Sequence, residues 1–260
     1  MNKQYGLAAF SMLVFLFLII PLVIIVVTAF GEERTIRFPI DGFTLKWFAA
    51  VFKSRSFMSS LRLSFRLALY ATLLSLATGI PAAYALGRTA FKTNGFLRGF
   101  FLSPTFIPGI VVGYALFQLI VVRLNMSIFS GLVLGHFLVT LPYVVRVVGA
   151  SLEQFDYSIE EAACSLGCHR VGAFWRVVLP NITSGIAAAF MLAFINSFNN
   201  VPVSMFLTGP GVSTLPTTLM SYIEYSYDPS VSAISVLLMG ITMILMFFVE
   251  KTLGIGSLAK

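Results

Sequence analysis

Long apolar segments separated by short polar stretches run through the whole chain. Six of them are long enough to cross a bilayer, because about 20 helical residues at ~1.5 Å each span a hydrocarbon core of ~30 Å. They cover residues 7–30, 63–86, 100–122, 128–148, 182–207 and 231–249. Lipid offers no partner to free backbone polar groups, so each segment should be a helix. We therefore predict an all-α, polytopic membrane bundle with six transmembrane helices, forming a single transmembrane domain over residues 1–260.

Composition supports a membrane setting. The chain is 58% hydrophobic and only 10% charged, whereas a soluble domain carries about 25% charged residues. The net charge is +7, but the basic residues are scattered through short loops without the continuous stripe that nucleic-acid binding needs. We expect the first apolar segment to be a retained span, because it is longer than the roughly 7–15 residues of a secretory leader's apolar region.

Orientation follows only weakly from charge. An even number of spans places both termini on one side of the membrane, and the Lys and Arg residues divide almost evenly between the two sides, so the positive-inside rule hardly separates the alternatives. The loop over residues 208–230 has no Lys or Arg, and Lys3 precedes the first span. Both features favour cytoplasmic termini.

A polar interruption over residues 156–180 separates the fourth and fifth apolar segments. Ser158 and Glu161 match an S-x-x-E capping box, which predicts a helix starting at Ser158, and Gly167 is a natural stop for it. A second short helix is predicted over residues 171–178, with Phe174, Trp175 and Val178 on one face and Leu179–Pro180 ending it. This small helix-turn-helix offers an Ala/Gly surface to another backbone. The alternative is purely local: a capping carboxylate and a C-terminal glycine.

The interruption also carries a long motif: E-A-A, three residues, G, nine residues, an aliphatic residue, one residue, L-P. Its members are Glu161, Ala162, Ala163, Gly167, Val177, Leu179 and Pro180. The motif resembles the EAA loop of binding-protein-dependent ABC importer permeases of the type I fold, in which Ile usually stands at the position of Val177. Residues 42–48, 206–210, 215–216 and 229–231 are similar to the second permease of spermidine/putrescine-type importers.

The resemblance implies a function and a set of partners. The chain would be an inner-membrane subunit of a bacterial importer, with both termini cytoplasmic, forming half of the pore for a small organic, nitrogen-containing solute of the polyamine class. Its partners would be a homologous second permease, two ATPase subunits, an extracytoplasmic solute-binding protein and the lipid bilayer. The ATPase contact would fall on Glu161, Ala162, Ala163, Gly167, Leu179 and Pro180.

Enzymatic chemistry has no recognisable basis in the sequence. A Gly-Lys dipeptide is missing, so no Walker A phosphate loop can form and ATP hydrolysis would belong to a separate chain. His136 and His169 lie far apart in sequence, and Cys164 and Cys168 alone do not make a metal site; we predict no catalytic residue, metal or cofactor. No Asp or Glu lies in mid-span, which counts against the alternative, a secondary transporter or channel acting without an ATPase.

Amides in the fifth segment are the candidates for the solute path. These amides are Asn196, Asn199 and Asn200, and exposing them to lipid would be energetically costly, so they either hydrogen-bond between helices or line a water-filled route. In the family that the chain resembles, the fifth span lines that route. Polyamine-type permeases often have acidic residues at the last two positions. Neutral amides there suit a less charged, zwitterionic or amino-acid-like solute. His136 and Gln118 are interpreted as packing or hydrogen-bonding residues.

Overall fold

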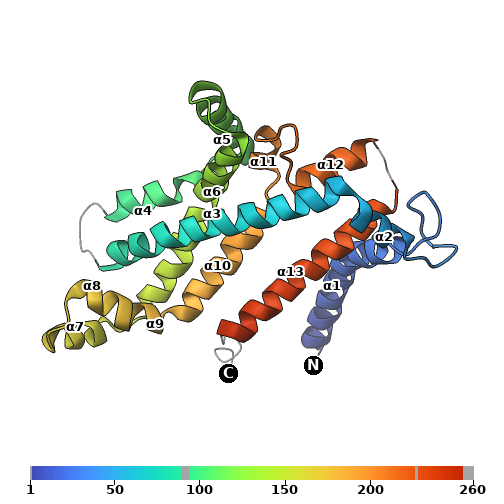
Figure 1. Ribbon diagram of the computed structural model, residues 1–260. Helices are drawn as coiled ribbons and strands as arrows, with labels where there is room; N and C mark the ends of the chain where they lie inside the picture. Colours follow the sequence, from blue (N-terminus) through green and yellow to red (C-terminus); the bar gives the residue numbers. More distant parts are fainter. Residues whose placement is uncertain (1, 89–93, 226–227, 254–260) are drawn as a thin grey trace. The chain divides into compact units, whose positions relative to one another are not determined.

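The structure is a computed structural model that describes residues 2–88, 94–225 and 228–253, and within these ranges every regular element is a helix (Figure 1). The all-α prediction is therefore confirmed. Two isolated β-bridges, Gly31 with Phe43 and Gly209 with Val212, hold loops together. The chain forms two compact units. One contains Met1–Ser59 and Thr218–Ile244, and the other contains Ser60–Thr217 and Leu245–Lys260. The single-domain organisation stays a prediction.

The first unit contains α1 (Asn2–Thr28), α2 (Lys46–Lys53), the later part of α12 (Leu215–Tyr225) and most of α13 (Ser230–Leu253). The buried hydroxyl of Thr28 donates to the carbonyl of Ile24 at 2.8 Å and lies 3.1 Å from the Ser232 hydroxyl, which ties the end of α1 to α13. Helix α12 falls in the stretch for which the sequence suggested only a loop.

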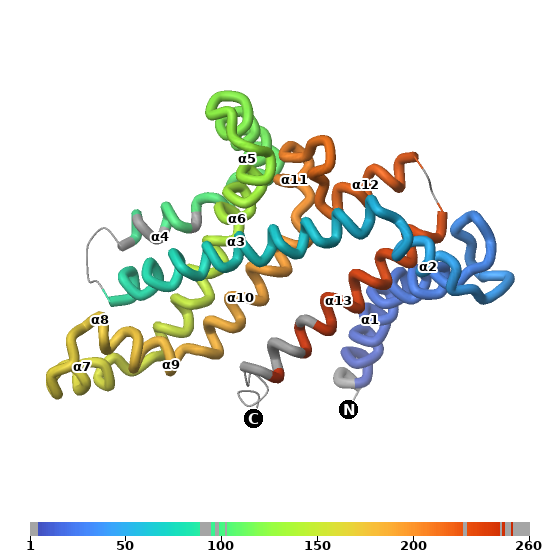
Figure 2. Tube along the Cα trace, viewed as in Figure 1, coloured from blue at the N-terminus to red at the C-terminus, as the bar shows by residue number. Residues whose placement is uncertain are grey.

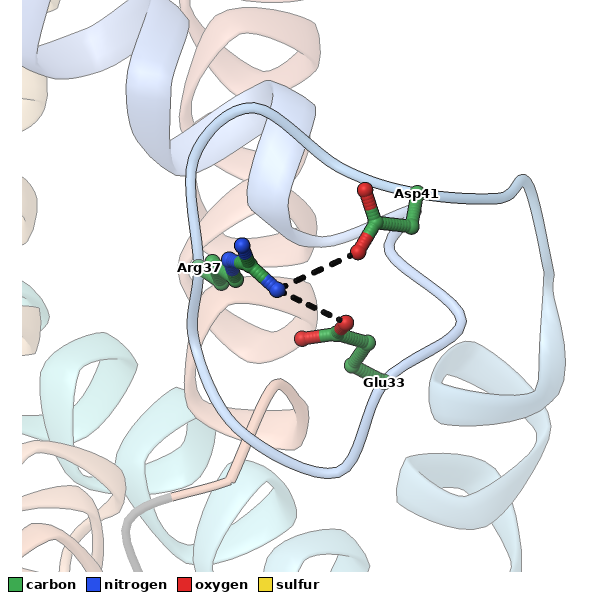
Figure 3. A network of polar contacts seen from close by, with 3 residues as sticks. All are labelled: Glu33, Arg37 and Asp41. Carbon is green, nitrogen blue, oxygen red and sulfur yellow. Dashed lines mark hydrogen bonds and ion pairs between the residues drawn. The ribbon is translucent and has the colours of Figure 1, made fainter.

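The loop that precedes α2 is held by aromatic contacts and by one ion network. The rings of Phe30 and Phe43 stack at 5.0 Å, and the indole N–H of Trp47 donates to the Gly31 carbonyl at 2.7 Å. Figure 3 shows the exposed Arg37 side chain between two carboxylates, 3.4 Å from Glu33 and 3.3 Å from Asp41. Exposed pairs of this kind add little stability, so the aromatic contacts carry most of the loop's order.

The second unit holds the remaining helices. In chain order they are α3 (Arg55–Arg88, which begins in the first unit), α4 (Asn94–Leu102), η1 (Ser103–Phe106), α5 (Gly109–Leu116), η2 (Phe117–Arg123), α6 (Ile128–Glu153), α7 (Tyr157–Ser165), α8 (Arg170–Ala173), η3 (Phe174–Val178), α9 (Leu179–Asn181), α10 (Thr183–Phe198) and α11 (Pro202–Phe206). Helices α6 and α10 run side by side, and α5 lies against α11 (Figure 2).

Small residues let the helices of the second unit approach closely. A methyl group at Gly79 of α3 would lie 2.7 Å from Val144 of α6, and one at Gly185 of α10 would collide with the Ser151 hydroxyl of α6. Close backbone approach at small residues is the usual way in which membrane helices gain packing energy. The fully buried Val148 fills the core beside these contacts.

The predicted spans are matched to different degrees within the described residues. Three helices are long and apolar enough to cross a membrane, namely Tyr5–Thr28, Arg55–Arg88 and Ile128–Glu153. Within the fifth predicted span lies Thr183–Phe198, which forms a pair bent by 75° with the preceding Arg170–Asn181 of the polar interruption. The third and sixth contain shorter apolar helices, Gly109–Arg123 and Ser230–Ile244. The number six thus stays a prediction, and the predicted side of the two termini involves residues 1 and 254–260, which lie outside the described residues.

Candidate functional site

Helix α7 follows α6 directly and is capped by a residue that the sequence motif did not single out. The carboxylate of Asp156 accepts the backbone N–H of Ser158 at 2.9 Å, and the helix begins at Tyr157. The predicted Ser158–Glu161 capping box was therefore wrong, because the carboxylate two residues upstream already takes this N–H. The backbone N–H and then the hydroxyl of Ser158 hold the pKa of Asp156 below its usual value.

Gly167 ends α7 as predicted. It has φ +91°, in the left-handed region that costs a residue with a Cβ roughly 1–2 kcal/mol. Its N–H donates to the Cys164 carbonyl at 3.0 Å, and the N–H of Cys168 donates to the Ala163 carbonyl at 3.1 Å. These two bonds form a Schellman motif, which satisfies the last carbonyls of the helix. The turn that follows α7 is thus well defined.

The inner side of α7 is fixed to α3 by Glu160, a residue that the sequence reasoning missed. Its side chain is fully buried. One carboxylate oxygen accepts the Tyr84 hydroxyl at 2.6 Å, and the other accepts the Arg88 guanidinium at 2.9 Å. A signal was available: Tyr84 and Arg88 stand four residues apart at the end of an apolar helix, so they share one face.

Aromatic rings surround this ion pair. The Tyr84 ring lies 4.8 Å from the Phe174 ring of η3, and the Arg88 guanidinium lies 5.5 Å from the centre of the Tyr157 ring. The buried Tyr157 hydroxyl has no hydrogen-bond partner among the described residues. Burial, and then the charge of Glu160, raise the pKa of Tyr157 above its usual 10.0. The phenol therefore stays neutral at any physiological pH.

Helix α7, the turn after it, α8 and η3 expose three large apolar side chains and one carboxylate. Leu166 is 90% exposed, Val171 66% and Trp175 64%, while Glu161 and Ala162 are also exposed. We call these five residues the exposed set. Large apolar side chains exposed in this way are typical of surfaces that another protein covers. The segment lies where α6 ends and α10 begins (Figure 1).

A cavity of about 710 Å³ opens between α3, α7 and α8. Glu161, Arg170 and Arg88 line it together with the Tyr157 ring. Arg88 is already paired with Glu160, so among the described lining residues the Glu161 carboxylate and the Arg170 guanidinium are the charged groups left to contact a bound molecule.

The second short helix differs from its prediction. Elements α8, η3 and α9 follow one another to Asn181, so Leu179–Pro180 does not end the helix; the 75° bend comes after it. The prediction that Phe174, Trp175 and Val178 share one face was wrong, because Val178 is fully buried and Trp175 is 64% exposed. The segment η3 is a π-helix, in which residues three positions apart do not share a face as they do in an α-helix. Of the motif's last two residues, Leu179 is half-buried against the core and Pro180 is exposed.

The three amides lie at the other end of α10. Asn200 accepts the backbone N–H of Val203 at 3.0 Å through its side-chain oxygen and caps α11. Asn199 is exposed and Asn196 half-buried. One structural role is therefore assigned within the cluster, and lining of a solute path stays a prediction.

Buried hydroxyls and one imidazole bridge the break between α10 and α11. His136 of α6 lies 2.8 Å from the Ser197 hydroxyl through Nδ1 and 3.0 Å from the Ser204 hydroxyl through Nε2. The prediction that His136 is a hydrogen-bonding residue is confirmed, and so is that for Gln118, which donates to the Tyr114 hydroxyl at 3.1 Å. Within the part of the chain that the structure describes, no group of three or more His, Cys, Asp or Glu could hold a metal ion.

Comparison with known proteins gives a consistent picture. The family described as binding-protein-dependent transport system inner membrane component matches residues 75–253. The chain is 29% identical over 261 residues to the spermidine/putrescine transport system permease protein PotC of Shigella flexneri, covering 96% of this chain and 97% of that protein. It is 27% identical to the putrescine transport system permease protein PotI of Escherichia coli K12, covering 87% and 83%. It is 26% identical to the sulfoquinovosyl glycerol transport system permease protein SmoH of Agrobacterium fabrum, covering 85% and 80%.

Solved structures share the fold. A bacterial ABC transporter involved in the import of the acidic polysaccharide alginate matches with a TM-score of 0.72 at 18% identity, covering 96% of both chains. The inward-facing methionine transporter MetNI matches with a TM-score of 0.63 at 18% identity, covering 77% of this chain and 97% of that one. The helical architecture described above is thus one that transport proteins use.

Proposed function

Because the chain belongs to the family of binding-protein-dependent transport system inner membrane components, we propose that it forms one half of the translocation pore of an ATP-driven importer. A homologous second permease supplies the other half, and an extracytoplasmic binding protein delivers the solute. Two separate ATPase subunits hydrolyse ATP. Helix α7 with the turn after it is the part that docks on an ATPase.

The exposed set, which runs from α7 through the following turn and α8 to η3, is the observation that carries this proposal. A docking helix needs one side held by its own protein and one side free. Glu160 supplies the held side, fully buried against α3, and Glu161 with Leu166 supplies the free side. Burial of Leu166, Val171 and Trp175 against a partner supplies the apolar part of such a contact.

The proposal fixes the orientation of the chain. The ATPase works where ATP is available, so α7–α9 and both termini lie in the cytoplasm. When ATP closes the ATPase dimer, the docked α7 moves with it, and the pore opens outward to receive solute. After ATP hydrolysis, the pore closes on its outer side.

The solute in this proposal is a small organic, nitrogen-containing molecule of the polyamine class. The names of PotC and PotI support it, while the name of SmoH shows that relatives at similar identity carry other solutes. The neutral Asn199 and Asn200 favour a solute of lower charge than a polyamine, such as a zwitterion. Uptake of labelled putrescine, spermidine and a zwitterionic analogue distinguishes these cases.

The docking role is tested in proteoliposomes that contain the chain, its partner permease and its ATPase. Glu161→Lys places a reversed charge in the contact, and Gly167→Asp adds a side chain where φ is +91°. Both variants should insert normally, yet lose ATP-driven uptake and stimulation of ATP hydrolysis. Gln154→Lys, an exposed position just before α7, is the matched control and should transport normally.

Full uptake by both α7 variants would overturn the docking role. Uptake by the lone chain, without an ATPase, would instead support the alternative of a secondary transporter or channel.

A further inference from the structure

We infer that Glu160 is the positioning residue that transmits movement of the docked α7 to α3. This inference rests on the proposed function. It gives Glu160 a role different from that of Glu161, the carboxylate of the motif. Glu161 would meet the ATPase, whereas Glu160 would carry the resulting displacement into the membrane part of the chain.

The first support is the completeness of the Glu160 contacts. Both carboxylate oxygens are used, one by Tyr84 at 2.6 Å and the other by Arg88 at 2.9 Å. Bonds to an ionised group are shorter and about twice as strong as neutral ones. A fully buried carboxylate that lost these partners would be left as an uncompensated charge away from water, which is strongly destabilising. Glu160 is therefore held firmly to α3.

The second support is that α7 and η3 contact α3 at more than one point. Tyr84 also packs on Phe174 at 4.8 Å, and Arg88 also lies over the Tyr157 ring at 5.5 Å. Tyr84 and Arg88 are one helical turn apart, so α7 and η3 are bound to α3 at two levels. A tilt or a slide of α7 should then move α3 instead of merely rotating a side chain.

The third support is a hydrogen-bonded link from α3 to the interior of the second unit. Ser75, about 13 Å along α3 from Tyr84 at ~1.5 Å per residue, lies 2.7 Å from the Thr140 hydroxyl of α6. Thr140 donates to the His136 carbonyl at 2.7 Å, and the His136 ring holds α10 and α11. Displacement of α3 thus has a physical connection to the break beside Asn199 and Asn200.

The test compares two isosteric changes in the assembled transporter, in proteoliposomes with solute-loaded binding protein. Glu160→Gln keeps the shape of the side chain but weakens both bonds, and Tyr84→Phe removes one bond and leaves the Arg88 pair. We expect Tyr84→Phe to lower the solute transported per ATP hydrolysed about tenfold, the scale of a lost hydrogen bond to a charged group. Glu160→Gln, which weakens both bonds, should lower it at least as much. The ATPase should still copurify with both.

Tyr70→Phe on the same helix is the matched control, since Tyr70 is half exposed and its ring contacts Phe129; its transport-to-hydrolysis ratio should equal that of the wild type. Wild-type ratios in both variants would overturn the inference and leave the proposed function intact. If Glu160→Gln fails to assemble, Tyr84→Phe alone decides. A lower amount of complex with an unchanged ratio would mean a structural role only and also overturns it. Failure of the wild type to couple uptake to ATP would instead contradict the proposed function.

Discussion

The carboxylate of Glu160 and the guanidinium of Arg88 lie 2.9 Å apart, although 72 positions separate them in the chain. The Glu160 side chain is fully buried and the Arg88 side chain is 22% exposed. This pair fixes α7 to the end of α3. It also leaves the adjacent Glu161 free to face a partner.

Removal of one member of the pair should destabilise the protein. Arg88→Met leaves an uncompensated buried charge on Glu160, which should lower the free energy of unfolding by about 3–5 kcal/mol. The double variant Arg88→Met, Glu160→Met removes both charges and should recover much of the loss. Thermal unfolding of the detergent-solubilised protein measures both. A single variant as stable as the wild type would contradict the structure of this contact.

The cysteines of α7 and its turn report on topology. Cys164 and Cys168 are free and half-buried. A membrane-impermeant thiol reagent should not reach them in intact cells and should label them in inverted vesicles, because the proposed docking places α7 in the cytoplasm. Ser165→Cys, at an exposed position between them, should label faster from the same side. Labelling from outside would overturn the orientation.

The sequence predicted the helical character of the chain because lipid forces apolar segments into helices. It did not predict where helices break. Hydropathy averages over a window, whereas breaks depend on single residues: Pro108 precedes α5 and Pro202 begins α11, where each lacks a backbone N–H for the helix. Helix α12 was missed because residues 215–225 mix polar and apolar side chains and read as a loop.

The sequence predicted only part of the candidate functional site, again because sequence patterns are local. The motif selected Glu161 and Gly167, and the structure places the first on the free side of α7 and the second at its end. Glu160 was missed because its partners lie on a distant helix, and local pattern does not reveal which of two adjacent carboxylates turns inward. The Asp156 cap was missed because the capping-box pattern fitted Ser158 equally well.

His136 should stabilise the break in the fifth apolar segment. Its ring is 1% exposed and bonded to two hydroxyls, and His136→Leu would leave Ser197 and Ser204 without this partner. At about 0.6–2 kcal/mol for each interhelical hydrogen bond in a membrane protein, loss of the two bonds should lower the free energy of unfolding by roughly 1–4 kcal/mol. Gln118→Leu, an exposed bond within one helical stretch, should change it little. Thermal unfolding with equal midpoints for both variants would contradict the assigned role.

Variants of the amides at the end of α10 can distinguish a capping role from a role in lining the solute path. Asn200→Asp keeps the oxygen that accepts the Val203 N–H, so it should fold normally and should favour more cationic solutes if the side chain meets them. Asn199 is exposed and ends α10 through its backbone N–H, which a side-chain substitution leaves in place, so it gives the cleaner measurement. Asn199→Leu should lower the uptake rate while solute affinity of the binding protein stays the same. Wild-type uptake of putrescine, spermidine and a zwitterionic analogue by both variants would remove the cluster from the path.

Cross-linking from the free side of α7 tests the central claim, that this helix docks on a separate ATPase. Leu166→Cys, at a position that is 90% exposed, is introduced into a Cys164→Ser, Cys168→Ser background, and a bifunctional thiol reagent is applied to membranes that contain the assembled transporter. Met126→Cys, at the opposite end of α6, is the control. The account predicts a covalent product of the Leu166→Cys chain with a protein that carries a Walker A phosphate loop, and no such product from Met126→Cys. The same product from Met126→Cys, or none from Leu166→Cys in a complex that transports solute, would contradict it.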